Sequence, residues 1–440
     1  MNDAVDHYIK TFEKLKKDLR QEPHWLTEMR EGAVSDLSQK GYPALKDAAW
    51  HFTDITPIRE TNWEIPAKYP SQKEINDQFA FFEEKYSKNI ILFMGGHFAK
   101  ENVSGSGVKV LPLSQAFRED SGFLEPCLNN FSGLSRDFFT DLNTSFMQNG
   151  VFIHIPGGQK VEEPIRLIFV ASASGARALF QPRNLIVLGQ KSEATVIETY
   201  EAKNDNVYFH NVVSQILLEE NASLKHYKVQ DEDPRSFHIA STYVLQKKAS
   251  SFSSLSVSAG ARIMRNNCRV FMLDEEAQCE LKGLSFSKRD QLLDHQTFVD
   301  HQKPKGTSRQ FFKGVFAGKS RGVFGGKVLV RKGAQQTNAS QTTKNLVLSD
   351  QAKVDAQPEL EILADDVKCS HGAAVGQLEE DAVFYLKSRG IGEKEANRIL
   401  VRGFVQEGIE ESIPSPVKNE IIGFVDAQLK EQIKHDEEKL

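Results

Sequence analysis

Apolar positions change their spacing twice along the chain, and these changes divide it into three parts. In the first 40 residues they recur every three or four positions, with charged residues between them: Ile9, Phe12, Leu15 and Leu19. This spacing is typical of an amphipathic helix. Residues 72–86 predict another helix, and residues 90–94 form a short apolar run typical of a strand. We therefore expect a helical or mixed N-terminal domain over residues 1–140.

From about residue 150 the helical spacing disappears for more than 200 residues. Short runs of β-branched and aromatic residues alternate there with polar turns, which indicates β structure. A recurring Leu-x-x-x-Ala element, with a longer and a weaker variant, follows one apolar strand and precedes the next. Its copies begin at Leu188, Leu218, Leu245, Leu273, Phe316 and Leu348, in steps of 30, 27, 28, 43 and 32 residues.

A repeat of this length predicts a stack of similar coils. Periods of 20–50 residues are typical of solenoids, propellers or arrays. In our interpretation each coil contributes an apolar strand to the interior and places a small Ala where coils pack closely. A propeller would need tight hairpins, whereas the turns of this repeat lack Asn-Gly and Asp-Gly pairs. We therefore expect a parallel β-helix core over residues 141–376, with a sandwich or jelly roll as the alternative.

The helical spacing returns after about residue 376. Residues 379–389 predict a helix that Gly390 ends. The next predicted helix carries on one face Ala396, Ile399, Leu400, Gly403 and Phe404. Ser415 and Pro416 are typical of an N-cap and first helical residue. The third helix has an apolar stripe of Ile421, Phe424, Val425, Leu429 and Ile433. These segments predict a C-terminal helical domain over residues 377–440.

Composition and charge narrow the function classes. The 440 residues carry a net charge of −5, which argues against a general nucleic-acid binder. Hydrophobic residues make up 40% and charged residues 26%, so a folded protein is expected. The four cysteines are Cys127, Cys268, Cys279 and Cys369, without a CxxC pair. A disulfide scaffold and a zinc knuckle are therefore disfavoured. No apolar run is long enough to span a membrane, and we expect a cytoplasmic protein.

Motifs for nucleotide chemistry are weak. The stretch from Gly314 to Ser320 resembles a phosphate-binding loop, but three residues separate Gly314 from Gly318 where such a loop has four. We interpret it as a strand and a turn. HExxH is absent as well. The sequence therefore predicts no catalytic residue and no nucleotide-binding site.

Two polar clusters are candidates for metal chemistry. Cys369 and His371 are two positions apart, so on a strand they face the same side. Thiolate and imidazole suit zinc, copper or iron, but a closed site needs more ligands. The alternative is a half-buried Cys beside a hydrogen-bonded His. The second cluster, within residues 294–301, repeats an Asp-His pair, which fits either a metal site or a polar ladder.

Linked motifs over roughly residues 140–425 point to a known family. They comprise Asp294-His295-x-Thr297-x-Val299-x-His301-x-x-Pro304, Phe312-Lys313-Gly314-Val315, Ala334-Gln335-x-Thr337, Leu360-Glu361-Ile362, Ala364-Asp365-Asp366-Val367, Cys369-Ser370-His371-Gly372-Ala373, and Phe384-Tyr385-Leu386-x-Ser388-Arg389-Gly390. Upstream, Trp50-x-x-Thr53-Asp54 matches loosely. The chain resembles the SufB/SufD family of iron–sulfur cluster assembly proteins. SufB-type chains carry acidic neighbours around the corresponding histidine. Ser370 and Gly372 stand there in this chain, which favours the SufD branch.

The resemblance implies a right-handed parallel β-helix between helical termini and a non-enzymatic scaffold role. It implies pairing with SufB through the β-helices and binding of the ATPase SufC through the C-terminal helices, for which the candidates are Ala396, Ile399, Leu400 and Phe404. It also implies that His371, and less firmly Cys369, handle iron or a nascent cluster at the SufB interface.

No cofactor is expected to bind the isolated chain stably. Flavin binding by the full complex and the oligomeric state of the isolated chain stay open, and a homodimer is one possible state, since a surface built for a homologous partner can accept a second copy. The rivals are a homodimeric β-helix scaffold without metal chemistry and a β-helix enzyme acting on polysaccharides.

Overall fold

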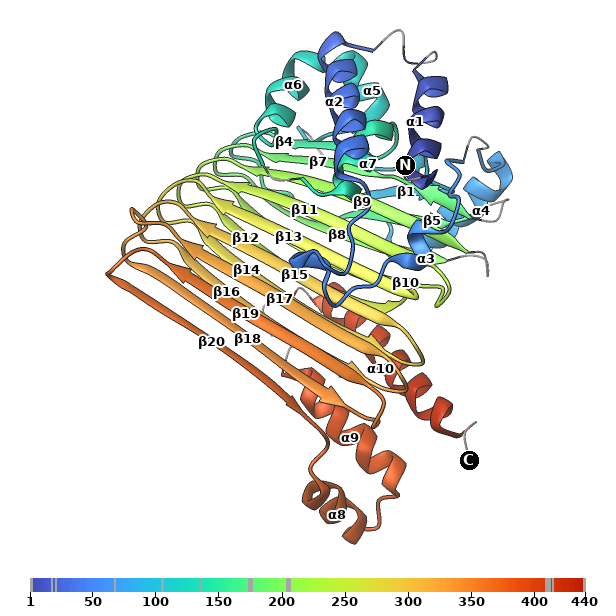
Figure 1. Ribbon diagram of the computed structural model, residues 1–440, viewed down its shortest axis with the longest axis vertical. Helices are drawn as coiled ribbons and strands as arrows, with labels where there is room; N and C mark the ends of the chain where they lie inside the picture. Colours follow the sequence, from blue (N-terminus) through green and yellow to red (C-terminus); the bar gives the residue numbers. More distant parts are fainter. Residues whose placement is uncertain are drawn as a thin grey trace.

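The protein is mainly β, with helices before and after a parallel β-solenoid (Figure 1). The structure, a computed structural model, describes residues 3–16, 19, 22–66, 69–103, 107–134, 136–172, 177–202, 207–407, 413 and 415–437. The predicted fold, a parallel β-helix core flanked by helical termini, is thereby confirmed.

The N-terminal part combines helices with three short strands. They are α1 (Asp3–Leu15), α2 (His24–Lys40), the 3₁₀ helix η1 (Ala48–Trp50), α3 (Thr56–Arg59), α4 (Gln72–Tyr86), β1 (Ile90–Met94), β2 (His97–Glu101), β3 (Lys109–Pro112), α5 (Leu113–Glu119), α6 (Ser121–Asn129) and α7 (Phe138–Phe146). The predicted helix over residues 72–86 and the predicted strand over residues 90–94 are both present. Ser71 starts α4 with a capping box, since its side chain accepts from Glu74 N–H and the Glu74 carboxylate accepts from Ser71 N–H.

Seventeen strands follow. They are β4 (Val151–Ile155), β5 (Ile165–Ala171), β6 (Ala178–Phe180), β7 (Arg183–Leu188), β8 (Glu193–Ala202), β9 (Tyr208–Leu218), β10 (Ser223–Glu232), β11 (Phe237–Gln246), β12 (Ser251–Gly260), β13 (Ile263–Met272), β14 (Gln278–Ser287), β15 (Leu292–His301), β16 (Thr307–Phe316), β17 (Arg321–Val330), β18 (Thr337–Val347), β19 (Lys353–Ile362) and β20 (Val367–Gly376).

From β7 onward, successive strands alternate between two sheets that face each other across the solenoid. One sheet has the order β2-β1-β5-β8-β10-β12-β14-β16-β18-β20, and the other has the order β19-β17-β15-β13-β11-β9-β7-β4-β3. Apart from the antiparallel pairs β1–β2 and β3–β4, neighbouring strands are parallel and in register from coil to coil. Ser223, for example, pairs with Ser251 and Ser251 with Gln278, which are 28 and 27 residues apart.

The Leu-x-x-x-Ala repeat belongs to turns on two different edges of the solenoid. The copies at Leu218, Leu245 and Leu273 lead from β9, β11 and β13 into the next strand of the opposite sheet. The copies at Phe316 and Leu348 lead back in the other direction, from β16 and β18. The six copies of the element therefore do not all mark the same turn of the coil. The 43-residue step, from Leu273 to Phe316, is where the copies change from one edge to the other.

The alanines of the repeat also have two different roles. Ala222 and Ala277 are fully buried at the start of a strand, as expected for close packing of coils. Ala249 instead occupies the turn with a left-handed φ of 51°, and Ser250 takes the buried position. Asn221 and Glu276 hold the equivalent turn position in the neighbouring coils, with φ of 58° and 63°.

The interior of the solenoid changes character along its axis. Near its start, Phe93, Phe169 and Tyr200 stack on one another from β1, β5 and β8, and the ring centroids of both pairs are 4.7 Å apart. Further along, polar side chains from alternate positions are buried in the interior, among them Glu198, His226, Lys228, Glu232, His238, His295 and Gln310.

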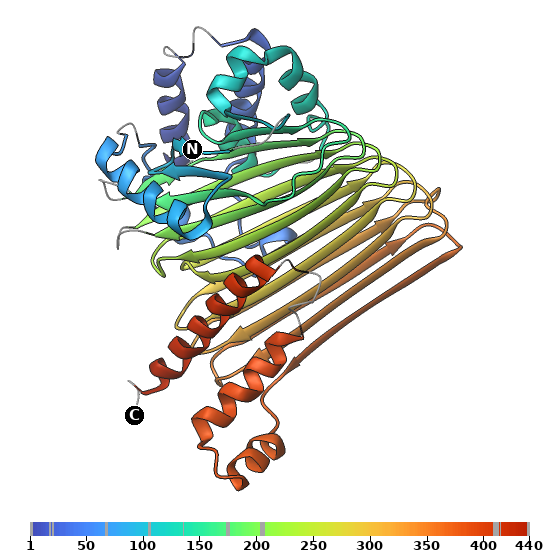
Figure 2. The ribbon, with the colours of Figure 1, turned by 180° about the vertical axis from the view of Figure 1, so that it is seen from behind.

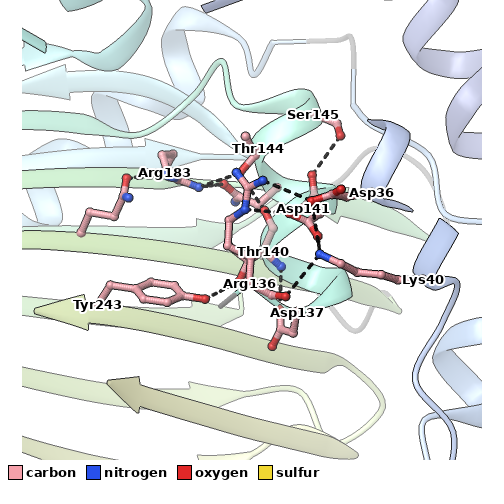
Figure 3. A network of polar contacts seen from close by, with 12 residues as sticks. Asp36, Lys40, Arg136, Asp137, Thr140, Asp141, Thr144, Ser145, Arg183 and Tyr243 are labelled. Atoms are coloured by element: carbon pink, nitrogen blue, oxygen red, sulfur yellow. Dashed lines mark hydrogen bonds and ion pairs between the residues drawn. The ribbon is translucent and has the colours of Figure 1, made fainter. Parts of the chain in front are cut away.

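Helices cover the outer face of the first coils. In Figure 3, Asp141 of α7 lies between Lys40 of α2 and Arg136, with N–O distances of 2.7 and 3.1 Å. Thr140 and Thr144 of α7 contact Tyr243 and the buried Arg183 guanidinium of the sheet. This network joins two helices to strands β7 and β11.

Three C-terminal helices complete the chain: α8 (Glu380–Ser388), α9 (Glu393–Gln406) and α10 (Ser415–Glu437). The bounds of the first agree with the prediction to one residue, and the third begins at Ser415, one residue before the predicted first helical residue Pro416. In Figure 2, α10 lies across the outer face of the sheet that contains β10. Val401, Val425 and Leu429 pack there against Tyr227 and Leu255. The side chain of Ile433 lies outside the described residues.

Candidate functional site

The last coil of the solenoid leaves strand edges open. β20 is the final strand of one sheet and β19 the final strand of the other, so within the described residues neither has a further neighbour. Ile362, Leu363 and Val375 of this coil are exposed large apolar residues, and the exposed fractions of Leu363 and Val375 are 55% and 53%. An open edge with apolar side chains is a template for another β chain.

His371 lies on this terminal strand and is exposed. Its Cα is in register with Gln341 of β18, and Gln341 is buried. His371 Nδ1 lies 3.1 Å from the carbonyl oxygen of Pro358 on β19. A carbonyl oxygen only accepts, so Nδ1 carries the proton and donates. The Nε2 lone pair is then available to a ligand, as in metal sites where a carbonyl orients the imidazole.

Cys369 lies two positions before His371 on the same strand and contacts the apolar interior. Burial raises the pKa of its thiol, so the free side chain is a protonated thiol at neutral pH. The alternation of a strand places both side chains on one face, with Cα atoms about 6.6 Å apart. The structure therefore brings the two predicted ligands together, one half-buried and one exposed.

The second predicted cluster is engaged in hydrogen bonds on both faces of β15, with Asp294 on the outer face and His295 in the interior. Asp294 accepts from Thr53 and Arg265, both at 2.5 Å. His295 Nε2 lies 3.0 Å from Ser285 Oγ, and burial lowers the pKa of His295 to about 3. These contacts favour the polar ladder. They also explain the Trp50-x-x-Thr53 segment, because the Arg265 guanidinium lies 3.9 Å from the Trp50 ring centroid.

The Asp-His pair at the end of the same strand also makes hydrogen bonds, whereas His301 Nδ1 has no partner among the described residues. Asp300 accepts two hydrogen bonds of 2.8 Å from Arg331. His301 Nε2 lies 2.8 Å from Ser308 Oγ. The predicted strand and turn from Gly314 to Ser320 is present, with Gly314 inside β16 and Gly318 in the following turn at φ 68°.

The predicted candidates on α9 differ in exposure. Ala396 is fully buried, Leu400 is partly buried, and the Phe404 ring lies under Lys313 with Nζ 4.3 Å from its centroid. Ile399 is 41% exposed. α8 carries Phe384 and Tyr385, which the sequence analysis named in a family motif but not as binding candidates, and they are exposed by 72% and 57%.

Of these two aromatic residues, Phe384 lines a groove. Its volume is about 440 Å³, and its walls come from α8, α9 and the end of β18, including Leu348, Leu378, Phe384 and Val401. The adjacent aromatic pair in the sequence could have indicated this exposed surface. Neighbouring residues of a helix point about 100° apart, so one face of a short helix cannot bury both rings. Among the helices of the described part, none has the length and apolar character to cross a membrane.

Comparisons with known proteins agree with one another. Residues 169–404 match the family model described as SUF system FeS cluster assembly, SufBD core domain, and residues 2–167 match the SufBD protein N-terminal region. The iron–sulfur cluster assembly SufBD family protein slr0076 of Synechocystis is 32% identical over 397 residues, covering 88% of this chain and 87% of the relative. The chloroplastic protein ABCI7 of Arabidopsis thaliana is 32% identical over 416 residues, covering 91% and 86%. The iron–sulfur cluster assembly protein SufD of Escherichia coli is 27% identical over 401 residues, covering 90% and 91%.

Proposed function

The chain belongs to the SufBD family of the SUF system for iron–sulfur cluster assembly, and we propose that it is a SufD-like scaffold subunit in the cytoplasm. In this role it pairs with SufB, binds the ATPase SufC and contributes to iron acquisition or nascent cluster assembly without catalysing a reaction itself. Relatives named SufD in Escherichia coli and Bacillus subtilis support the branch, as do Ser370 and Gly372 beside His371.

The observation that carries the proposal is an exposed imidazole at the open end of the solenoid. His371 Nδ1 is held by the Pro358 carbonyl, which leaves Nε2 as a ligand for iron or a nascent cluster. Four ligands close most such sites, so SufB supplies the ligands that this chain lacks. Cys369 can join only as a thiolate, which binding of the metal would favour over the protonated thiol.

SufC docks on α8 and α9. Exposed aromatic and aliphatic residues next to a groove are typical of an interface core, and Phe384, Tyr385 and Ile399 provide them. Ala396 and Phe404 act behind this surface by holding α9 in place. A change of SufC during its ATP cycle shifts the position of these helices only if SufC contacts them differently in its two states.

Co-purification tests these partner assignments. The chain, co-expressed with SufB and SufC, is expected to form a complex with both. In the Phe384→Ala/Tyr385→Ala variant, the affinity for SufC should fall about tenfold or more while SufB is still bound, because two anchor residues of the interface are removed. Phe81→Ala is the matched control, since Phe81 is an equally exposed aromatic (56%) on α4. Equal SufC binding by all three chains would contradict the assignment of the α8 surface.

The open edge also fits a second role, a homodimeric scaffold without metal chemistry. Strand edges of one copy would then pair with those of another across a two-fold axis. A stable homodimer that excludes SufB in the same co-purification would favour this role over the first.

A further inference from the structure

A cluster of two histidines and one glutamate lies inside the solenoid, away from the terminal coil. His210 of β9, Glu232 of β10 and His238 of β11 each direct one nitrogen or oxygen toward the others, and these atoms all lie within 4.8 Å of one another. The three residues are at most 4% exposed. They come from three consecutive strands. β9 and β11 are neighbours in one sheet and β10 belongs to the other, so the cluster connects the two sheets across the interior.

The contacts within the cluster are short and converge on the carboxylate. His210 Nδ1 lies 2.6 Å from Glu232 Oε1, and His238 Nδ1 lies 2.7 Å from Glu232 Oε2. The second contact lacks the direction of a hydrogen bond, so that nitrogen has no hydrogen-bond partner among the described residues. The same is true of the buried Gln230 Oε1, although Gln230 Nε2 donates to Glu232 Oε2 at 3.0 Å. Two such atoms beside three converging ligand atoms leave room for a bound ion to act as their partner.

We propose that His210, Glu232 and His238 form a binding site for a divalent transition-metal ion of the Zn²⁺ or Fe²⁺ class. Two imidazoles and one carboxylate are the protein ligands of many zinc sites and of non-haem iron sites, which keep further positions for water. With the ion on both Nδ1 atoms, each ring carries its proton on Nε2. The Nε2 of His238 faces away from the ion and lies 2.8 Å from Lys228 Nζ.

This site is independent of the proposed iron handling at His371. Within their sheet β10 and β20 are separated by five strand steps, or about 24 Å at the usual spacing of strands. An ion at the interior site would fix β9, β10 and β11 relative to one another. It would therefore support the fold near the N-terminal helices rather than cluster transfer at the terminal coil.

Metal analysis of the full-length chain tests the proposal. The chain, expressed in zinc-supplemented medium and exchanged into metal-free buffer, is expected to retain about one Zn²⁺ per chain. Glu232→Gln and His238→Gln should each lower bound zinc by about tenfold or more. His295→Gln is the matched control, because His295 is also buried in the interior but contacts Ser285 instead of a carboxylate. This variant and His371→Ala should retain the ion.

Spectroscopy of the unaltered chain gives a second readout that does not depend on how the variants fold. Replacement of zinc by Co²⁺ should give the visible bands of a nitrogen–oxygen site without a thiolate-to-cobalt charge-transfer band. Expression in iron-supplemented medium without added zinc shows whether Fe²⁺ occupies the same site. Less than about a tenth of an equivalent of either ion in the purified chain, a thiolate band, or zinc retained equally by Glu232→Gln would overturn the proposal.

Discussion

At the scale of single residues, Glu407 shows how one exposed carboxylate fixes a helix to the solenoid. Its oxygens lie 2.5 Å from Lys313 Nζ and 2.7 Å from Lys344 Nζ. The Lys313 ammonium is almost fully buried and also donates to the carbonyl of Phe404 in α9. Hydrogen bonds from the two lysines lower the pKa of Glu407 to about 2 from its ordinary 4.5.

Glu407→Gln should therefore destabilise the chain in a pH-dependent way. The pKa of Glu407 is lower in the folded chain, so its contribution is complete above pH 4.5 and disappears as pH falls toward 2. The side chain is half exposed, and we expect about 1 kcal/mol at pH 7. Urea denaturation of both chains at pH 7, 4 and 3 measures this difference. Glu395→Gln, whose ion pair with Arg398 is on the surface of α9, is the control without such an effect.

The candidate residues were predictable only in part. The C-x-H spacing and the family resemblance led to Cys369 and His371, and their placement on one strand face follows from alternation alone. The exposure of His371 does not follow from alternation. His371 is exposed because, in the described part of the chain, no further coil packs on β20. The burial of Ala396 and the exposure of Phe384 depend likewise on how α8 and α9 lie on the solenoid. His210, Glu232 and His238 are distant enough in sequence that only the register of β9, β10 and β11 joins them.

At the scale of elements, glycine turns set how closely consecutive segments pass. Gly150, before β4, has a φ of 125°, and a Cβ there would lie 1.9 Å from the carbonyl oxygen of Arg183. Gly158 has a φ of 74°, but a Cβ there would have no neighbour within 4 Å. Both glycines have a left-handed φ, but only Gly150 is also in close contact with another backbone segment. Comparing the two positions therefore distinguishes the cost of the conformation from the cost of the contact.

Gly150→Ala is expected to destabilise the chain by about 3 kcal/mol or more, since the backbone of β7 must move. Gly158→Ala should cost only about 1 kcal/mol, the strain of the left-handed conformation. Thermal and urea denaturation of both variants measure the two values. Equal losses of stability in the two variants would show that the backbone at Arg183 moves away from a new Cβ without a measurable loss of free energy.

The repeat in the sequence predicted the stacked coils but not the two kinds of turn. Leu273 and Phe316 look alike as anchors, although they stand at opposite edges of the solenoid. Strand runs of about ten residues alternate in both sheets with similar polar turns, so the local pattern does not tell one edge from the other. The break in the period at 43 residues was the available signal.

At the scale of the whole molecule, the solenoid is covered at its first coils and open at its last. The helices α2 and α7 cover the start, whereas β19 and β20 end in exposed backbone edges with Leu363 and Val375 beside them. The terminal coil is therefore the surface on which the proposed pairing with SufB depends.

Leu363→Glu should weaken association with SufB by about tenfold or more, because a charge would enter the apolar part of the interface. Leu45→Glu is the control, since Leu45 is a comparably exposed leucine (47%) in the N-terminal part. Titration of the two variants against SufB measures the affinities. If both bind as the unaltered chain does, the partner uses another surface.

The most direct test of the proposed function is anaerobic spectroscopy of the reconstituted complex with and without His371. His371→Ala should leave the complex assembled but lower its iron content and cluster absorbance about tenfold or more. His51→Ala is the matched control, because His51 is also exposed with Nδ1 against a backbone carbonyl, 3.2 Å from that of Leu45. Unchanged iron content and cluster absorbance in His371→Ala would contradict a ligand role for this residue at the shared interface.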